Sequence, residues 1–184
     1  MIRQAQKNQN RNLSVLIYDA IKDIAHTLTG ENQRENVLST LDMYVNMDTN
    51  RLSYNNIWVY EAHHQAVGLI LAYDSNDLER LDAPILAHLA SKNIFKDSFE
   101  MECFADEFYI DTVSVDSRFQ GRGIAKKLFA FIENKAKESG YRKISLLVDV
   151  DNKKALSLYK KLGFQKNTIL EVSGHSYHHM IKIL

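Results

Sequence analysis

The feature that most constrains the fold is a strand that runs into a glycine-containing turn and then into an amphipathic helix. The stretch from Glu107 to Val115 (EFYIDTVSV) is rich in branched and aromatic residues, which is typical of a buried strand. The next segment, from Asp116 to Arg122, predicts a tight turn, and two of the chain's seven glycines, Gly121 and Gly123, precede a helix. The apolar residues that predict one buried stripe on this helix are Ile124, Leu128, Phe131, Ile132 and Ala136.

This turn has the properties of an anion-binding site. A helix N-terminus presents unpaired N–H groups and the positive end of the helix dipole. Glycine allows a close approach of the backbone to a phosphate. A dinucleotide fingerprint requires a third glycine where this chain has Lys126, and no Walker sequence is present. From these residues alone, a turn that needs glycine only for its geometry is the alternative to a pyrophosphate site.

The rest of the chain predicts one α/β domain over residues 1–184. Helical patterns cover 13–24, 34–45 and 77–97, whereas 56–62 and 66–73 are rich in branched and aromatic residues and predict a hairpin. After the amphipathic helix, the predicted elements are a strand at 143–150, a helix at 152–163 and strands at 164–172 and 175–184. Alternating strands and helices indicate some parallel pairing.

The charge balance and the cysteine content argue against several classes of protein. Lysine and arginine number 23, as do aspartate and glutamate, so no basic field favours nucleic acid or a membrane surface as partner. Cys103 is the single cysteine, which leaves no internal disulfide. The N-terminal MIRQAQKNQN lacks the apolar run of a secretion signal. We therefore expect a cytoplasmic protein that binds neither membranes nor nucleic acid.

A second set of residues accompanies the turn. Gln120, Gly123 and Ala125 form the pattern Gln-x-x-Gly-x-Ala directly after the strand, and the segment DVDNKKALSLYKKLGF follows one strand later. In this order and spacing, residues 107–165 resemble the GNAT superfamily of acyl-CoA-dependent N-acyltransferases, and the rest of the chain resembles it more loosely. The resemblance implies an α/β (α+β) fold, with helices flanking a mostly antiparallel sheet that splays at the cofactor site. It also implies transfer of an acetyl group from acetyl-CoA to a primary amine.

The resemblance assigns the donor site residue by residue. The turn would wrap the pyrophosphate of CoA with backbone amides, and the edge of the preceding strand would pair with the pantetheine arm. Asn152 would hydrogen-bond the cofactor, although a helix N-cap is the alternative role. The implied cofactor-binding residues are Thr112, Val113, Ser114, Val115, Gln120, Gly121, Arg122, Gly123, Ile124, Ala125, Lys126 and Asn152.

Three residues are predicted to act in catalysis by direct attack in a ternary complex. Tyr159 matches the tyrosine that often lies near the CoA sulfur in this family, where its hydroxyl can protonate the leaving thiolate; a core tyrosine is the alternative. The attacking amine also needs a proton acceptor. Glu107 and Asp111 share one face of a regular strand, so either is a candidate base. A carboxylate that only pairs with a lysine or arginine is the alternative for both.

The charge of one segment predicts the class of acceptor. The stretch KDSFEMECFADEFYID, residues 96–111, carries six carboxylates against Lys96 alone, which would attract a cation. We therefore expect a small cationic amine or a peptide amine as the acceptor, with a homodimer as a possible assembly. A noncatalytic acyl-CoA-binding sensor or scaffold is the rival function. Cys103 is expected to be a structural thiol, and no metal site is expected from His175, His178 and His179.

Overall fold

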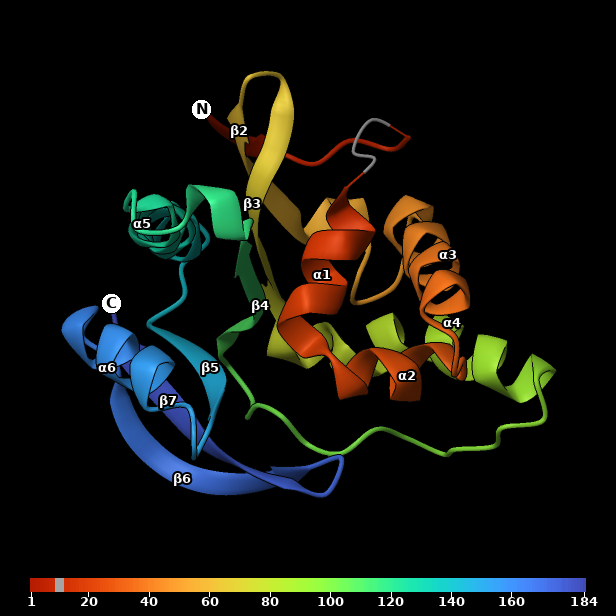
Figure 1. The fold of residues 1–184 in the computed structure, drawn as a ribbon. Helices are drawn as coiled ribbons and strands as arrows, with labels where there is room; N and C mark the ends of the chain where they lie inside the picture. The colour runs from red at the N-terminus through yellow and green to blue at the C-terminus, as the bar shows by residue number, and fades with distance from the viewer. Residues whose placement is uncertain (9–11) are drawn as a thin grey trace.

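A seven-stranded sheet runs through the computed structural model, which describes residues 1–8 and 12–184 (Figure 1). The strand order is β1-β2-β3-β4-β5-β7-β6, and every neighbouring pair is antiparallel except β4 and β5, which are parallel. The strands are β1 (Ile2–Gln4), β2 (Ile57–Ala62), β3 (Gln65–Asp74), β4 (Phe108–Val115), β5 (Lys143–Asp149), β6 (Gln165–Val172) and β7 (His175–Ile183). The mixed, mostly antiparallel sheet expected from the resemblance is therefore confirmed.

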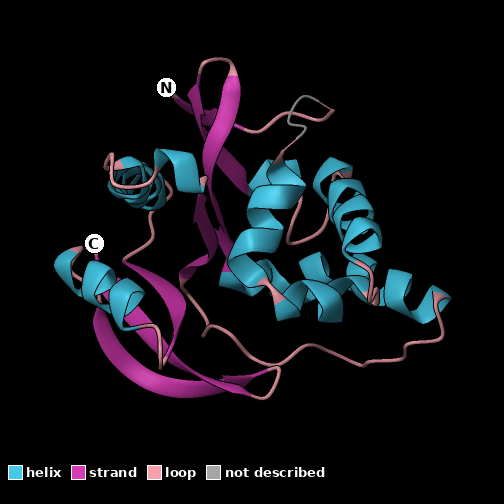
Figure 2. Cartoon of the chain, viewed as in Figure 1, coloured by secondary structure: helices cyan, strands magenta, loops and turns pink. Residues whose placement is uncertain are grey.

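Helices cover both faces of this sheet (Figure 2). They are α1 (Leu13–Ile21), α2 (Asp23–Thr29), α3 (Arg34–Asn46), α4 (Leu78–Ser91), α5 (Ile124–Glu138) and α6 (Lys153–Lys161). The helices α1 to α4 share one hydrophobic core with side chains such as Leu71 and Tyr109. The helices α5 and α6 share a second core, on the other face, with Ile70 and Ile110. The sheet thus separates two cores. No helix among the described residues is long and apolar enough to cross a membrane.

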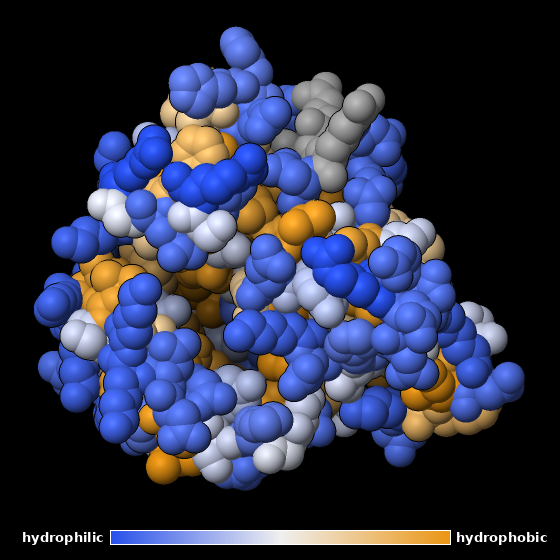
Figure 3. All heavy atoms as spheres, viewed as in Figure 1, coloured by the Kyte–Doolittle hydropathy of each residue, from blue (hydrophilic) through white to orange (hydrophobic). Residues whose placement is uncertain are grey.

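The parallel pair opens after three residues. Phe108–Ile110 of β4 pair with Ile144–Leu146 of β5, and no further pairing joins the two strands in the described chain. Both strands continue, β4 to Val115 and β5 to Asp149, so they diverge toward their carboxyl ends. Figure 3 shows a hollow with an apolar floor where Figure 1 shows this divergence. The splay expected between two parallel strands is present, and we call this gap the split.

Close packing fixes the start of α5 against the sheet. A Cβ added to Gly68 of β3 would lie 3.1 Å from Cγ2 of Ile124 and 3.2 Å from the Ser114 carbonyl oxygen, so glycine is the residue that fits. The buried stripe of α5 differs from the predicted one at one position. Phe129 is buried, whereas Phe131 is half-buried beside Trp58, with ring centroids 6.4 Å apart.

Two other predicted segments differ from the structure. The single helix expected over 13–24 is divided into α1 and α2, because Lys22 adopts a φ of 44°, which interrupts the helix. The helix expected over 77–97 ends at Ser91. Residues 92–107 then run without helix or strand from α4 to β4, along the bottom of Figure 1. We call residues 92–107 the acidic strap.

Candidate active site

The turn between β4 and α5 leaves a row of backbone donors open. Gly121 and Gly123 each have a φ of +76°, the left-handed region that glycine enters without strain, and an added Cβ at either would have no atom within 4 Å. Within the described chain, the N–H groups of residues 121–126 have no hydrogen-bond acceptor, and no side chain caps α5. The predicted anion site is therefore a helix N-terminus with free donors in front of open space.

Beyond Ile110, β4 is paired along one edge only. Residues 112–115 pair with Leu71 to Gly68 of β3, and their other edge faces the split. Thr112 is buried, whereas Val113, Ser114 and Val115 are half-buried. Gln120 folds back so that its side-chain amide donates to the Val115 carbonyl at 3.0 Å. The open edge offers backbone N–H and C=O groups to an extended ligand, in the manner of an added strand.

Asn152 and Tyr159 lie on α6, which follows β5. Asn152 is the N-cap of α6, since its Oδ1 accepts from the Ala155 N–H at 3.0 Å, and its side chain is exposed. The Tyr159 ring packs edge-on against Phe129 and Phe164, with centroids 5.5 and 6.2 Å away. Burial raises the pKa of Tyr159, so the phenol stays protonated at neutral pH. Its hydroxyl has no hydrogen-bond partner among the described residues.

Asp111 lies at the apex of the split. Ile110 is the last residue of β4 that pairs with β5, and it also pairs with Ala72 of β3. The next pair on β3 joins Leu71 to Thr112, which leaves Asp111 in a bulge. Its carboxylate accepts from the Tyr73 hydroxyl at 2.6 Å and from the Thr112 hydroxyl at 2.7 Å. Tyr73 belongs to the core under α1–α4, so Asp111 points to that face.

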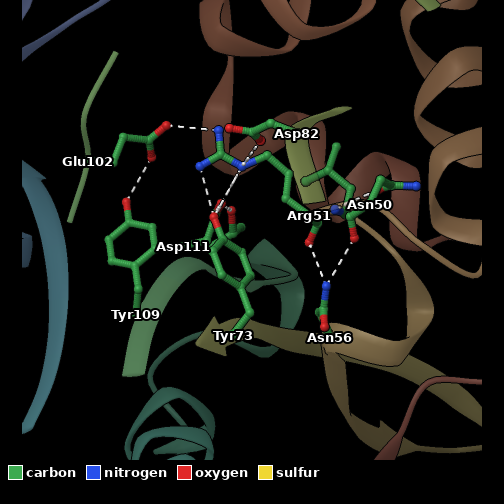
Figure 4. Close-up of polar contacts among 10 residues, drawn as sticks. Asn50, Arg51, Asn56, Tyr73, Asp82, Glu102, Tyr109 and Asp111 are labelled. Atoms are coloured by element: carbon green, nitrogen blue, oxygen red, sulfur yellow. Dashed lines mark hydrogen bonds and ion pairs between the residues drawn. The ribbon is translucent and has the colours of Figure 1, made fainter. Parts of the chain in front are cut away.

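A buried arginine collects three carboxylates beside this apex (Figure 4). Arg51, in the loop after α3, is only 2% exposed. Its guanidinium lies 2.9 Å from Glu102, 3.3 Å from Asp111 and 3.4 Å from Asp82. It also donates to the Tyr73 hydroxyl, while the Tyr109 hydroxyl donates to Glu102 at 2.8 Å. We call this group the Arg51 cluster; its members are Arg51, Tyr73, Asp82, Glu102, Tyr109 and Asp111.

The Arg51 cluster holds one cation for three carboxylates. Burial, together with the charges of Glu102 and Asp111, raises the pKa of Asp82 to about 6 despite the opposing effect of Arg51. Burial likewise raises the pKa of Glu102, with Asp111 acting in the same direction and Arg51 against it. Like charges in a buried place disfavour ionisation. The cluster therefore carries an excess of negative charge that a proton or a second cation would relieve.

Glu107 lies on the same strand region but has a different environment. It is 1% exposed and accepts from the Ser145 hydroxyl at 2.7 Å and the Phe104 N–H at 3.0 Å, while the ring of His179 lies 2.9 Å away. Burial raises the pKa of Glu107, but these hydrogen bonds outweigh it and leave the pKa below its usual value. Its carboxylate ties the acidic strap to β5 and β7, and its role as a base stays a prediction.

The charges of three carboxylates from separate segments act on Tyr177. Tyr177 on β7 pairs with Asp149 on β5, across the split from β4. Burial raises the pKa of Tyr177, and the charges of Asp149, Glu102 and Asp23 raise it further. Asp23 begins α2, Glu102 belongs to the acidic strap and Asp149 ends β5. Negative charge therefore acts on this part of β7, whereas Arg122 and Lys126 are exposed at the turn between β4 and α5.

The cysteine and the histidines considered in the sequence analysis contact other residues of the fold. Cys103 is buried, and burial raises its pKa to about 12, which is typical of an inert thiol. His179 packs edge-on against Phe104, with ring centroids 4.9 Å apart, and His178 lies beside Lys166. Among the described residues, no group of three or more histidine, cysteine, aspartate or glutamate side chains has the geometry of a metal site.

Sequence reasoning missed Arg51, Tyr73, Tyr109 and Tyr177 as members of the site. The sequence around each of them is also typical of a strand or loop residue without a role in a site. The sequence does not distinguish Glu102 from the other acids of residues 96–111. In the structure Asp97, Glu100 and Asp106 are exposed, whereas Glu102 points inward. One signal was present: Arg51 is the single charge in the run NRLSYNNIWV, which leads into a buried strand.

The family comparison agrees with this geometry. The acetyltransferase (GNAT) family matches the chain over residues 21–164. The chain belongs to this family. Acetyltransferases of the GNAT family take their acetyl group from acetyl-CoA, which suits a site with a turn of free N–H donors and an open strand edge.

Individual relatives extend the comparison. A crystal structure described as that of an acetyltransferase is 33% identical, covers 100% of this chain and 98% of its own, and superposes with a TM-score of 0.82. The spermine/spermidine N(1)-acetyltransferase of Bacillus subtilis is 34% identical over 36% of this chain and 44% of its own length. The N-alpha-acetyltransferase 30 of Saccharomyces cerevisiae is 39% identical over 30% of this chain and 32% of its own length. The match spans less than half of these two curated relatives.

The charge of the Arg51 cluster predicts a pH-dependent stability. The folded state raises the pKa of Asp82 to about 6, above that of an unfolded aspartate, so folding is opposed once Asp82 is ionised. The free energy of unfolding therefore decreases as pH rises from about 4 to 6, the range in which Asp82 ionises. Asp82→Asn should therefore raise the free energy of unfolding by about 1–3 kcal/mol at pH 8 and by much less at pH 4. Urea titrations at both pH values measure this, with exposed Glu79→Gln as control. An equal effect of Asp82→Asn at both pH values would contradict the charge argument.

Proposed function

We propose that this protein is an acetyl-CoA-dependent N-acetyltransferase that acetylates a primary amine by direct attack in a ternary complex. One observation carries the proposal: the split in the sheet has a turn with free N–H donors on one side and a set of carboxylates on the other. The proposed donor site lies beside α5 and α6, and the proposed acceptor site lies under α1 and α2. The two substrates would then meet through the split.

The residues present fit a CoA ligand. The free N–H groups of residues 121–126 can bind pyrophosphate, and exposed Arg122 and Lys126 add positive charge. The open edge of residues 112–115 can pair with an amide-containing arm such as pantetheine. Asn152, which uses Oδ1 to cap α6, keeps its NH2 group for the ligand.

The chemistry requires two proton transfers. The amine must lose a proton before or during attack, and the CoA thiolate leaves more readily when it gains one. Tyr159 is the proposed donor to the sulfur, because it is protonated at neutral pH and its hydroxyl is free within the described chain. A backbone N–H on the open edge of β4 is the proposed oxyanion donor. Glu107 and Asp111 are the bases proposed from the sequence.

A cationic amine is the acceptor class that charge favours. The charges of Asp23, Asp149 and Glu102 all act on Tyr177 at the proposed acceptor side, and negative charge there would concentrate cations. A small polyamine-like molecule is supported by the spermine/spermidine relative, and a peptide amine by the N-alpha-acetyltransferase relative. The cytoplasmic location and the homodimer stay predictions.

An amine panel tests the activity and the acceptor class together. We expect the protein to release free CoA from acetyl-CoA in the presence of polyamines, amino sugars or peptide amines, with Michaelis constants that rise at high salt because salt screens the carboxylates. Release of CoA can be followed with a thiol reagent. A noncatalytic acyl-CoA sensor would bind acetyl-CoA and release no CoA with any amine. A preference for neutral or acidic acceptors without a salt effect would contradict the cationic acceptor.

The donor turn is tested by Gly123→Val. A branched side chain at this φ of +76° strains the turn and enters the open space in front of it, so acetyl-CoA affinity should fall by well over tenfold, which is more than about 1.4 kcal/mol. Gly140→Val is the matched control, because Gly140 has a φ of +83°, has the same open surroundings, and lies beyond the other end of α5. Calorimetric titration measures the affinity. Equal binding by the two variants would remove the turn from the donor site.

The leaving-group role is tested by Tyr159→Phe. The phenylalanine keeps the packing against Phe129 and Phe164 but removes the proton donor, so turnover should fall by about 10²-fold or more while acetyl-CoA affinity is retained. Tyr60→Phe, at a half-buried tyrosine beside Lys127 of α5, is the control. Wild-type turnover in Tyr159→Phe would leave Tyr159 as a core residue.

A further inference from the structure

Glu102 links the loop that carries Arg51 to β4, beside the closed end of the split. One carboxylate oxygen accepts from the Tyr109 hydroxyl of β4 at 2.8 Å, and the other lies 2.9 Å from Nη1 of Arg51 (Figure 4). On the opposite side, the charge of Glu102 reaches the Tyr177 hydroxyl of β7. The residue comes from the acidic strap. Its partner Tyr109 is next to Ile110, the last residue of β4 that pairs with β5, so the Glu102 carboxylate lies near the point where the split begins.

The side chains of Asp82, Glu107 and Asp111 are all more buried than that of Glu102. Asp111 accepts from Thr112 through one oxygen and from Tyr73 through the other, and Glu107 is held by Ser145, His179 and the strap backbone. Asp82 lies on α4, and its side chain is 9% exposed, against 10% for Asp111 and 14% for Glu102. Glu102 is therefore the most open carboxylate of the Arg51 cluster.

The surroundings of Glu102 also suit a proton acceptor. Arg51 and Tyr109 fix its two oxygens from different directions, and the loop that carries Arg51 is itself held, since Asn56 donates to the carbonyls of Asn50 and Arg51 at 3.0 and 3.3 Å. The excess of carboxylates over cations in the cluster favours an arriving cation or proton. Burial raises the pKa of Tyr109 well above its usual value, so Tyr109 remains a donor to Glu102.

We propose that Glu102 accepts the proton of the acceptor ammonium, and that Arg51 and Tyr109 are its positioning residues. The inference rests on the function proposed above and assigns its base to Glu102, in place of Glu107 and Asp111, the two candidates from the sequence. The ammonium gives one proton to the Glu102 carboxylate, and the free amine forms the C–N bond to the thioester carbonyl carbon. The C–S bond then breaks, the thiolate takes a proton from Tyr159, and Tyr159 recovers one from the second N–H of the attacking nitrogen. Glu102 finally releases its proton to solvent.

A pH profile distinguishes Glu102 from its neighbours. Because the pKa of Glu102 is raised, its carboxylate form is lost at a higher pH than for an ordinary glutamate, so turnover should fall as pH drops through that pKa. The titratable and charged groups that face it are Arg51, Tyr73, Asp82, Cys103, Tyr109, Asp111 and Tyr177. Asp82 is the neighbour with a pKa of about 6, so Asp82→Asn must retain the acid limb of the profile if Glu102 produces it.

The experiment compares Glu102→Gln with Glu100→Gln, an exposed glutamate two residues away on the same strap. With the best amine of the panel, Glu102→Gln should lower kcat by about 10²-fold or more and remove the acid limb, while acetyl-CoA affinity and the melting temperature stay near those of the wild type. Glu102→Asp should restore part of the turnover. Glu100→Gln should behave as the wild type.

A second acceptor separates a base from a structural residue. An analogue of the same amine with two fluorines on the neighbouring carbon has a much lower ammonium pKa and carries a far larger fraction of free base at the assay pH, so Glu102→Gln should lose far less activity with it. An equal loss with both amines, or wild-type turnover and pH profile in Glu102→Gln, would overturn the proposal. A wild-type protein that binds acetyl-CoA but acetylates no amine would overturn the proposed function, and the assignment of a base with it.

Discussion

The short parallel pairing of β4 and β5 is the constraint on which the rest of the structure depends. Two parallel strands cannot be joined by a tight hairpin, so the chain must leave β4 and return through a crossover, which here is α5. That requirement places the start of a helix directly at the end of β4. Because the pairing lasts only three residues, the same strand end is also open along one edge. A turn with free N–H donors and a free strand edge thus arise from one topological feature.

The opposite face depends on a different interaction, the burial of Arg51. A buried guanidinium requires partners, and this one obtains them from α4, the acidic strap, β3 and β4. These contacts fix the middle of a strap that has no helix or strand of its own. The excess of carboxylates around a single arginine makes the arrangement electrostatically unfavourable without a further cation. Such local instability is common where a site is built for a charged substrate.

The sequence predicted the donor side better than the acceptor side, for physical reasons. The turn, the strand before it and α6 are adjacent in the chain, so glycine positions and helical spacing describe them directly. The strand β1, the break at Lys22 and the end of α4 at Ser91 depend on tertiary contacts and local backbone geometry that periodicity does not report. The Arg51 cluster joins residues up to 60 positions apart, from Arg51 to Asp111, so no local pattern could group them. Whether a glutamate of the acidic strap pointed inward or outward was likewise decided by the fold.

The separation of the two hydrophobic cores by the sheet has a consequence for how such a protein can change. Substitutions in α1 to α4 and in the acidic strap repack one core and leave the packing of α5 and α6 largely untouched. Distant sites without shared partners contribute almost independently to stability. If the sites lie as proposed, one half of the molecule can diversify or be redesigned for new amines while the other half keeps the same cofactor. Acceptor specificity could then change without a change in the cofactor site.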